Sequence, residues 1–217
     1  MSENAVQVKE KKESLLSKKN LKIVTDPFLD NNPITIQVLG ICSALAVTSK
    51  LDKAIVMSIA VVFVLTLANL TISVLRKAIP PQIRMIVELV VVAALVTLVS
   101  ELLHAFQYAM YKDLSVYIGL IITNCIVMGR LEAFAMANSP GKAIMDGIGN
   151  GLGYGGILIA VAFFRELFGM GTLMGVQIMP ASFVNNGLMV MPAAAMFLIG
   201  IFIWIQRSVN KELVDIS

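Results

Sequence analysis

Two cysteines are the residues of this chain whose chemistry and spacing stand out. Cys42 and Cys125 are the only cysteines, and each lies near the middle of a short apolar segment. Each is followed by a tripeptide of one basic residue, leucine and one acidic residue, which begins at Lys50 after the first and at Arg130 after the second. The sequence therefore predicts an internal repeat with one thiol at the centre of each copy.

Thiolates are soft ligands, and they suit iron–sulfur clusters, zinc or copper(I). The alternatives are a disulfide, which we do not expect at membrane depth, and two ordinary buried cysteines. A [2Fe-2S] cluster needs four thiolates, whereas Cys42 and Cys125 provide two. If the pair binds such a cluster, another chain must donate the rest, and a homologous membrane protein in the opposite orientation is the natural donor.

The elements that hold the cysteines must lie in a membrane, because 58% of the residues are hydrophobic, 14% are charged and the mean hydropathy is +0.84. A net charge of +3 gives no support for nucleic-acid binding. A membrane-spanning helix needs about 20 apolar residues. Four stretches meet this length, namely Ala54–Leu75, Met85–Leu103, Ile148–Phe168 and Gly187–Ile205, whereas the cysteine segments Ile34–Ser49 and Leu114–Gly129 hold only 16 residues each.

These six elements predict an all-α integral membrane protein built from two three-helix repeats. Three is odd, so the repeats must be inverted, and in inverted repeats paired short or broken helices mark the functional site. We expect the first helix of each repeat to be such a half-helix; the alternative is an ordinary helix extended by polar residues. The predicted divisions are an N-terminal tail (1–30), the first repeat (31–112), the second repeat (113–207) and a C-terminal tail (208–217).

Basic residues predict the orientation of these helices. If the N-terminus is cytoplasmic, the inside loops and tails carry 13 of the 17 lysines and arginines, as the positive-inside rule favours. We therefore expect both termini in the cytoplasm. The first 30 residues are polar and rich in lysine, so no signal peptide is expected.

Ionisable residues at membrane depth are candidates for an ion pathway, because they are costly to bury there. Glu88 lies inside the third element, Glu101 lies near its outer end, and Asp146 precedes a glycine-rich helix. Glu101 and Asp146 are the leading candidates for such a pathway. The alternative for each is an interfacial residue that snorkels or pairs. Arg165 and Glu166 end the glycine-rich helix, as a potential pair.

Glycines in that helix fall at two kinds of spacing. Gly147, Gly151 and Gly155 lie on one helical face, which predicts close approach of a neighbouring helix or of the half-helices. The run that begins at Gly151 also fits a dinucleotide fingerprint, but no strand precedes it, so that interpretation fails.

Polar residues flank both cysteine segments. The run Asn31–Pro33 predicts the start of the first short helix. Ser43, Thr48 and Asn124 are candidate hydrogen-bond donors to cluster sulfurs or to free backbone carbonyls. Ordinary bonds between helices are the alternative.

Four strings together resemble a known family: LDNNPI at 29–34, QVLGICSALAVT at 37–48, GLIITNCIVMGR at 119–130 and DGIGNGLGYG at 146–155. They are similar to the D-subunit family of the bacterial sodium-translocating NADH:quinone oxidoreductases (Na+-NQR), over roughly residues 26–207. The E subunit of the Rnf-type ferredoxin:NAD oxidoreductases is the nearest alternative. The DNNPI run at 30–34 and the EAFAM run at 132–136 favour the first family.

The resemblance implies a specific role. It implies a multi-pass protein of the bacterial inner membrane that pairs with a paralogous E subunit in the opposite orientation. The matching positions, Cys42 and Cys125, would bind the iron of a [2Fe-2S] cluster shared by the two proteins, which relays electrons across the membrane. The whole complex would oxidise NADH, reduce ubiquinone and export Na+. NADH, FAD, FMN and ubiquinone would bind elsewhere in the complex, which also contains A, B, C and F subunits, so no catalytic residue is expected here.

An inverted-repeat secondary transporter is the rival from another functional class, since inverted repeats alone predict it equally well. A transporter would keep its activity when either cysteine is replaced. A redox subunit would not.

Overall fold

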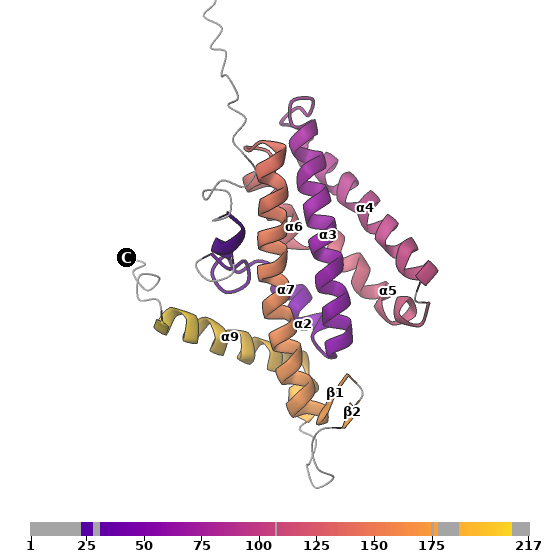
Figure 1. Ribbon diagram of the computed structural model, residues 1–217, viewed down its shortest axis with the longest axis vertical. Helices are drawn as coiled ribbons and strands as arrows, with labels where there is room; N and C mark the ends of the chain where they lie inside the picture. The colour runs from indigo at the N-terminus through magenta and orange to yellow at the C-terminus, as the bar shows by residue number, and fades with distance from the viewer. Residues whose placement is uncertain (1–22, 28–30, 107, 175, 178–186, 210–217) are drawn as a thin grey trace, which may run out of the picture.

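The computed structural model describes residues 23–27, 31–106, 108–174, 176–177 and 187–209, and these are mostly helical (Figure 1). The long helices are α3 (Leu51–Leu75), α4 (Arg84–Phe106) and α7 (Pro140–Met170). In Figure 1 they form the main bundle, in which α3 lies between α4 and α7. The α3–α7 pair makes the most extensive contact of any two elements and forms the centre of the fold.

Shorter elements complete the fold. They are α2 (Ile41–Val47), α5 (Tyr108–Ile122), α6 (Cys125–Arg130), the π-helical turn η1 (Leu131–Ala135), α8 (Gly187–Val190) and α9 (Pro192–Val209). Two strands of two residues each, β1 (Thr172–Leu173) and β2 (Val176–Gln177), pair in an antiparallel arrangement. Helix α9 runs away from the bundle, as Figure 1 shows.

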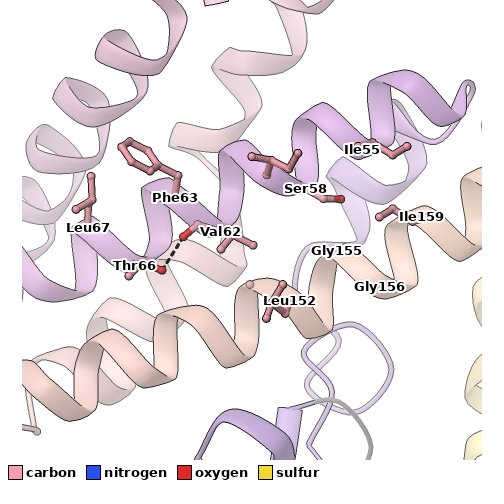
Figure 2. A pocket seen from close by; sticks show the side chains of 12 residues that line it. Ile55, Ser58, Val62, Phe63, Thr66, Leu67, Leu152, Gly155, Gly156 and Ile159 are labelled. Carbon is pink, nitrogen blue, oxygen red and sulfur yellow. Dashed lines mark hydrogen bonds between the residues drawn. The ribbon is translucent and has the colours of Figure 1, made fainter. Parts of the chain in front are cut away.

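Glycines explain why α3 and α7 pack so closely. A Cβ atom added at Gly147 would lie 2.8 Å from the Cα of Thr66, and one added at Gly151 would lie 3.0 Å from the Cα of Val62. One turn further, a Cβ at Gly155 would lie 3.0 Å from the Cβ of Ser58. Figure 2 shows these α3 residues facing the glycines of α7, beside an apolar groove of about 610 Å³. The predicted close-packing role of this glycine face is thus confirmed, and the neighbour is α3.

A second glycine face of α7 receives the N-terminal segment. A Cβ at Gly149 would lie 2.9 Å from the Cα of Val24, and one at Gly153 would lie 2.5 Å from the carbonyl oxygen of Pro27. Asn32 then donates a hydrogen bond of 3.2 Å from Nδ2 to the carbonyl oxygen of Gly153. The chain therefore reaches its first cysteine by packing along α7.

Helix α7 has clear signals at both ends. Pro140 lies at its first position, where the missing N–H costs no helical hydrogen bond. Gly171 ends it with a left-handed conformation (φ 68°), and its N–H donates to the carbonyl of Leu167. These signals make α7 a 31-residue helix, which is longer than one membrane crossing requires.

The expected membrane-spanning stretches are largely confirmed. Three of the four expected spans correspond to described helices that are long and apolar enough to cross a membrane: Leu51–Leu75, Arg84–Phe106 and Pro140–Met170. A fourth such segment, Tyr117–Ala135, has 19 residues and overlaps the second cysteine segment, which was expected to be too short to span. The prediction of one uninterrupted span over Gly187–Ile205 is wrong. Helix α8 ends at Val190 and α9 begins at Pro192, because proline lacks the N–H that would continue α8.

The all-α membrane class is confirmed, whereas the inverted repeat and its boundary at 112/113 stay predictions. The predicted tails, residues 1–30 and 208–217, lie mostly outside the described residues.

Candidate functional site

Both cysteines lie in the first turn of a short helix. Cys42 is the second residue of α2, which has seven residues, and Cys125 is the first residue of α6, which has six. The predicted short elements are thus broken helices, and each cysteine directly follows a break.

The first break contains two residues with left-handed backbones. Asn32 accepts from the N–H groups of Ile34 and Thr35 and caps a single turn, as its position before Pro33 predicts. Val38 (φ 57°) and Gly40 (φ 81°) then interrupt the helix before α2 begins. A β-branched residue rarely adopts positive φ, so the sequence carries little sign of this break. The predicted helix start at Asn31–Pro33 is therefore a single turn, and the break at Val38 and Gly40 separates it from α2, which carries Cys42.

The second break is made by an asparagine cap. Asn124 has an extended backbone, and its Oδ1 accepts a 3.3 Å hydrogen bond from the N–H of Ile126. This cap starts α6 at Cys125 and separates it from α5.

One hydrogen bond joins the two cysteine loops, which are the breaks that precede Cys42 and Cys125, across 85 residues of sequence. The N–H of Gly40 donates to the Sγ of Cys125 at 3.0 Å. Both thiols are free, Cys42 is exposed and Cys125 is half-buried. The internal contact therefore brings the loops together, and neither cysteine residue is fully buried.

Ser43 lies at the centre of a buried network beneath these loops. Its Oγ donates to the carbonyl of Gly40 at 2.8 Å, lies 2.7 Å from the Oη of Tyr154, and accepts from the Nδ2 of Asn124 at 3.2 Å. Thr48 donates to the carbonyl of Ala44. Ser43 and Thr48 thus bind carbonyls, which is one of the two predicted alternatives. Sequence reasoning missed Tyr154, whose only signal is a lone phenol within the glycine run.

Arg165 and Glu166 do not pair with each other in the described contacts; each binds the ends of other helices. Arg165 donates to the hydroxyl of Thr48 at 2.6 Å, and its other partners are backbone carbonyls of Leu45 and residues 189–191. Glu166 accepts from the N–H of Leu51, at the start of α3, and of Met174. The two charges hold the turn between α2 and α3.

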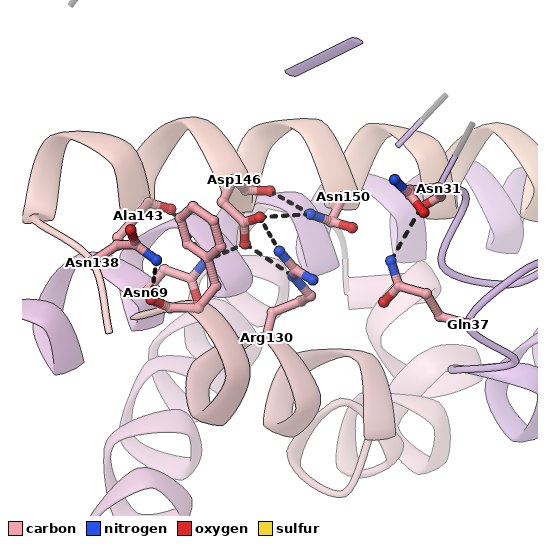
Figure 3. A network of polar contacts seen from close by, with 9 residues as sticks. Asn31, Gln37, Asn69, Arg130, Asn138, Ala143, Asp146 and Asn150 are labelled. Atoms are coloured by element: carbon pink, nitrogen blue, oxygen red, sulfur yellow. Dashed lines mark hydrogen bonds and ion pairs between the residues drawn. The ribbon is translucent and has the colours of Figure 1, made fainter. Parts of the chain in front are cut away.

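Asp146 is the centre of a second polar network (Figure 3). It is 1% exposed and forms a two-pronged ion pair with Arg130, in which Nε donates to Oδ2 at 3.0 Å. Asn69 and Asn150 donate to the same carboxylate. The network lines a cavity of about 390 Å³ whose other wall includes Gln37 and the N-terminal segment. The amide oxygens of Asn69 and Asn150 have no hydrogen-bond partner among the described residues.

Glu88 is fully buried on α4, and within the part of the chain that the structure describes neither of its carboxylate oxygens has a hydrogen-bond partner. Its charged neighbours are Glu132, on η1, and Arg84. Arg84 forms an ion pair with Glu132. Glu101 is exposed on α4 and takes no part in the networks around Asp146 or Glu88. The structure therefore does not bring the two leading ion candidates together.

The donor set suits a shared metal centre. Among the described residues, no group of three or more histidine, cysteine, aspartate or glutamate side chains could hold a metal ion. Two cysteines on joined loops would supply two of the four thiolates of such a centre, and the sulfur of Cys125 already accepts the kind of N–H hydrogen bond that metal-bound sulfur accepts. An iron–sulfur cluster fits these residues only with thiols from a partner.

Comparison with known proteins gives one consistent result. Residues 20–203 match the family model described as Rnf-Nqr subunit, membrane protein. The chain is 54% identical over 203 residues to the D subunit of the Na(+)-translocating NADH-quinone reductase of Shewanella sp. strain ANA-3, and the match covers 91% of this chain and 97% of that protein. The proteins of the same name from Shewanella oneidensis MR-1 and Shewanella baltica OS155 are 54% and 53% identical, with the same coverage.

Proposed function

The chain belongs to the Rnf-Nqr family of membrane subunits, and on that premise we propose that it is the D subunit of a sodium-translocating NADH-quinone reductase. Its part in that enzyme is to supply Cys42 and Cys125 as two of the four ligands of an intramembrane iron–sulfur cluster. The other two ligands come from a paralogous E subunit in the opposite orientation. The names of the relatives favour this enzyme over the Rnf-type alternative.

The hydrogen bond from Gly40 N–H to Cys125 Sγ is the observation that carries the proposal. It ties together loops that are 85 residues apart, so the two thiols belong to one site. The exposure of Cys42 leaves room for a partner to complete that site. When bound, the cluster supplies one-electron transfer between an NADH-reduced donor and a quinone-linked acceptor. This chain contributes the thiolates, the N–H donor and the rigid setting around them.

The rest of the assembly follows from the same role. NADH, FAD, FMN and ubiquinone bind other subunits, and the complex lies in the bacterial inner membrane with both termini of this chain in the cytoplasm. The apolar helices α3, α4 and α7 support membrane insertion. The basic-residue distribution supports the orientation.

Asp146 is our leading candidate for a sodium ligand in this chain. Sodium takes hard oxygen ligands, as do the calcium and magnesium ions of proteins. Asp146 and Asn150 both line one cavity, and the buried amide oxygen of Asn150 has no hydrogen-bond partner among the described residues. A sodium ion there would compete with Arg130 for the Asp146 carboxylate. Glu88 and Glu101 remain further candidates, at separate places on α4.

The test of the electron-relay role is iron and sulfide analysis with electron paramagnetic resonance on the purified complex. Cys42→Ser and Cys125→Ser should each abolish the cluster signal and quinone reduction, while NADH oxidation by an artificial acceptor survives. Ser49→Ala, at the other end of the same segment, is the matched control and should leave both intact. Wild-type complex without iron, or full quinone reduction in Cys42→Ser, would refute the proposal. Retained activity in both cysteine variants would favour a transporter.

The test of the ion pathway is the sodium dependence of the same quinone reductase activity. Asp146→Asn should raise the Na+ concentration needed for half-maximal rate, because it removes the buried carboxylate that lines the cavity beside Asn150. Gln37→Glu is a useful second variant, since it adds a carboxylate to the cavity wall. It should lower the Na+ concentration needed for half-maximal rate. Unchanged sodium dependence in Asp146→Asn, with normal assembly, contradicts this role.

A further inference from the structure

Tyr154 is a fully buried side chain in the middle of α7, and the electron-relay role described so far makes no use of it. Its ring lies directly against Gly40: a Cβ atom added at Gly40 would be 2.9 Å from the Cε2 of the ring. Its hydroxyl lies 2.7 Å from the Oγ of Ser43. One side chain of α7 thus contacts the loop that carries the first cysteine in two ways.

The directions of the hydrogen bonds in this cluster can be assigned from the chemistry. Ser43 has a single hydroxyl proton, and it points to the carbonyl oxygen of Gly40, which can only accept. The Tyr154 hydroxyl must therefore donate to Ser43. Asn124 uses its Oδ1 to accept from Ile126, so its NH₂ group is the one that donates to Ser43. The Ser43 oxygen is fully satisfied, with one bond donated and two accepted.

This assignment connects α7 to the break before each cysteine. Through Ser43, the phenol of Tyr154 holds the carbonyl of Gly40, two residues before Cys42, and the side chain of Asn124, one residue before Cys125. The N–H of the same Gly40 reaches the Sγ of Cys125. The Gly40 backbone is thus held at its N–H by the thiol, at its carbonyl by Ser43 and at its Cα by the ring.

We propose that Tyr154, acting through Ser43, is the positioning residue that holds the Gly40 N–H on the Cys125 sulfur and thereby raises the reduction potential of the iron–sulfur cluster. The proposal rests on the cluster site described above. Reduction adds one electron, and the extra negative charge is shared by the sulfur ligands. An N–H donor on sulfur stabilises that reduced state, and such hydrogen bonds are among the factors that set cluster potentials.

The test uses the intact complex with Tyr154→Phe and, separately, Ser43→Ala. Phenylalanine keeps the ring that packs on Gly40 and removes only the hydroxyl. Tyr117→Phe is the matched control, because Tyr117 is half-buried on α5, its ring lies beside Lys53, and it is not among the hydrogen-bonded residues of this network. The readouts are iron per complex and a redox titration followed by electron paramagnetic resonance.

We expect Tyr154→Phe and Ser43→Ala to keep iron but shift the midpoint potential to more negative values, while Tyr117→Phe matches the wild type. A tenfold drop in the equilibrium constant for reduction, about 59 mV for one electron, is the largest shift expected. The double variant should shift no further than either single variant, since both break one connection. Loss of iron from an assembled Tyr154→Phe complex, with iron kept in the control, would overturn the inference, because Tyr154 would then be needed to retain the cluster rather than to set its potential.

An unchanged potential in Tyr154→Phe, with a normal iron content, would overturn the inference and leave the cluster assignment standing. Absence of iron from the wild type would overturn the cluster assignment itself. If Tyr154→Phe does not assemble, Ser43→Ala decides the question, because it removes the same connection without altering α7.

Discussion

Gly147→Ala should lower the thermal stability of the protein, because the added methyl group forces α3 and α7 apart. The new Cβ would lie 2.8 Å from the Cα of Thr66, whereas carbon atoms in favourable contact are about 3.5–4.0 Å apart. Backbone atoms of one long helix cannot rotate away as a side chain can. The two helices must therefore separate by up to about 1 Å, or bend, at their tightest contact.

The magnitude follows from two opposing effects. Overpacking of a well-packed contact costs about 1–3 kcal/mol, and replacing glycine by alanine inside a helix returns about 1 kcal/mol. The net loss for Gly147→Ala is thus about 1 kcal/mol, with an upper limit near 2. For a chain of this size, 1 kcal/mol corresponds to a drop of about 2–4 °C in the midpoint of thermal unfolding.

The assay is heating of the full-length chain in detergent, followed by size-exclusion chromatography of a fluorescently tagged form. Gly200→Ala is the matched control: it lies inside α9, and a Cβ there meets nothing within 4 Å. The control should unfold at the wild-type temperature or slightly above it. A Gly147→Ala midpoint equal to that of Gly200→Ala would show that the α3–α7 contact is looser than described, and the reasoning would fail.

The same heating assay tests three further predictions, on a helix cap, a buried ion pair and a buried arginine. Asn124→Ala removes the side-chain cap of α6 and should cost about 1 kcal/mol; Thr97→Ala, at an exposed position inside α4, is its control. Arg130→Met and Asp146→Asn should each lower the midpoint more than the double variant does, since a single change leaves one buried partner without the other; additive effects would argue against a buried pair. Arg165→Met should lower the midpoint most, because several carbonyls and Thr48 lose their donor; a wild-type midpoint would contradict this.

Features that depend on neighbouring residues in the sequence were predictable. Helices α3, α4 and α7 follow from uninterrupted apolar stretches, and the spacing of Gly147, Gly151 and Gly155 predicts a close helix contact. The two cysteine segments are recognisable as short because their apolar runs are only 16 residues long. Each of these signals reflects a local property: length, hydropathy or the period of a helix.

Features that depend on distant residues were not predictable. The positive φ of Val38 has no local signal in the sequence, since a valine alone disfavours it. Tyr154 meets Ser43 across 111 positions of sequence, and no spacing rule connects the two. Adjacency suggests a pair between Arg165 and Glu166, but successive residues of a helix point in different directions. The break at Pro192 is different, since the proline is visible in the sequence while hydropathy alone predicts a continuous helix.

Helix α7 joins the two candidate sites through one rigid element. Asp146 and Tyr154 are eight residues apart on it, which is about 12 Å at 1.5 Å per residue. At an effective dielectric constant of about 20, two unit charges at that distance interact by about 1.4 kcal/mol, a tenfold effect on an equilibrium. If the proposed cluster and the proposed Na+ site lie at about this separation, a negative charge gained at the first would favour cation binding at the second by an effect of this size. Such coupling would need no movement of α7.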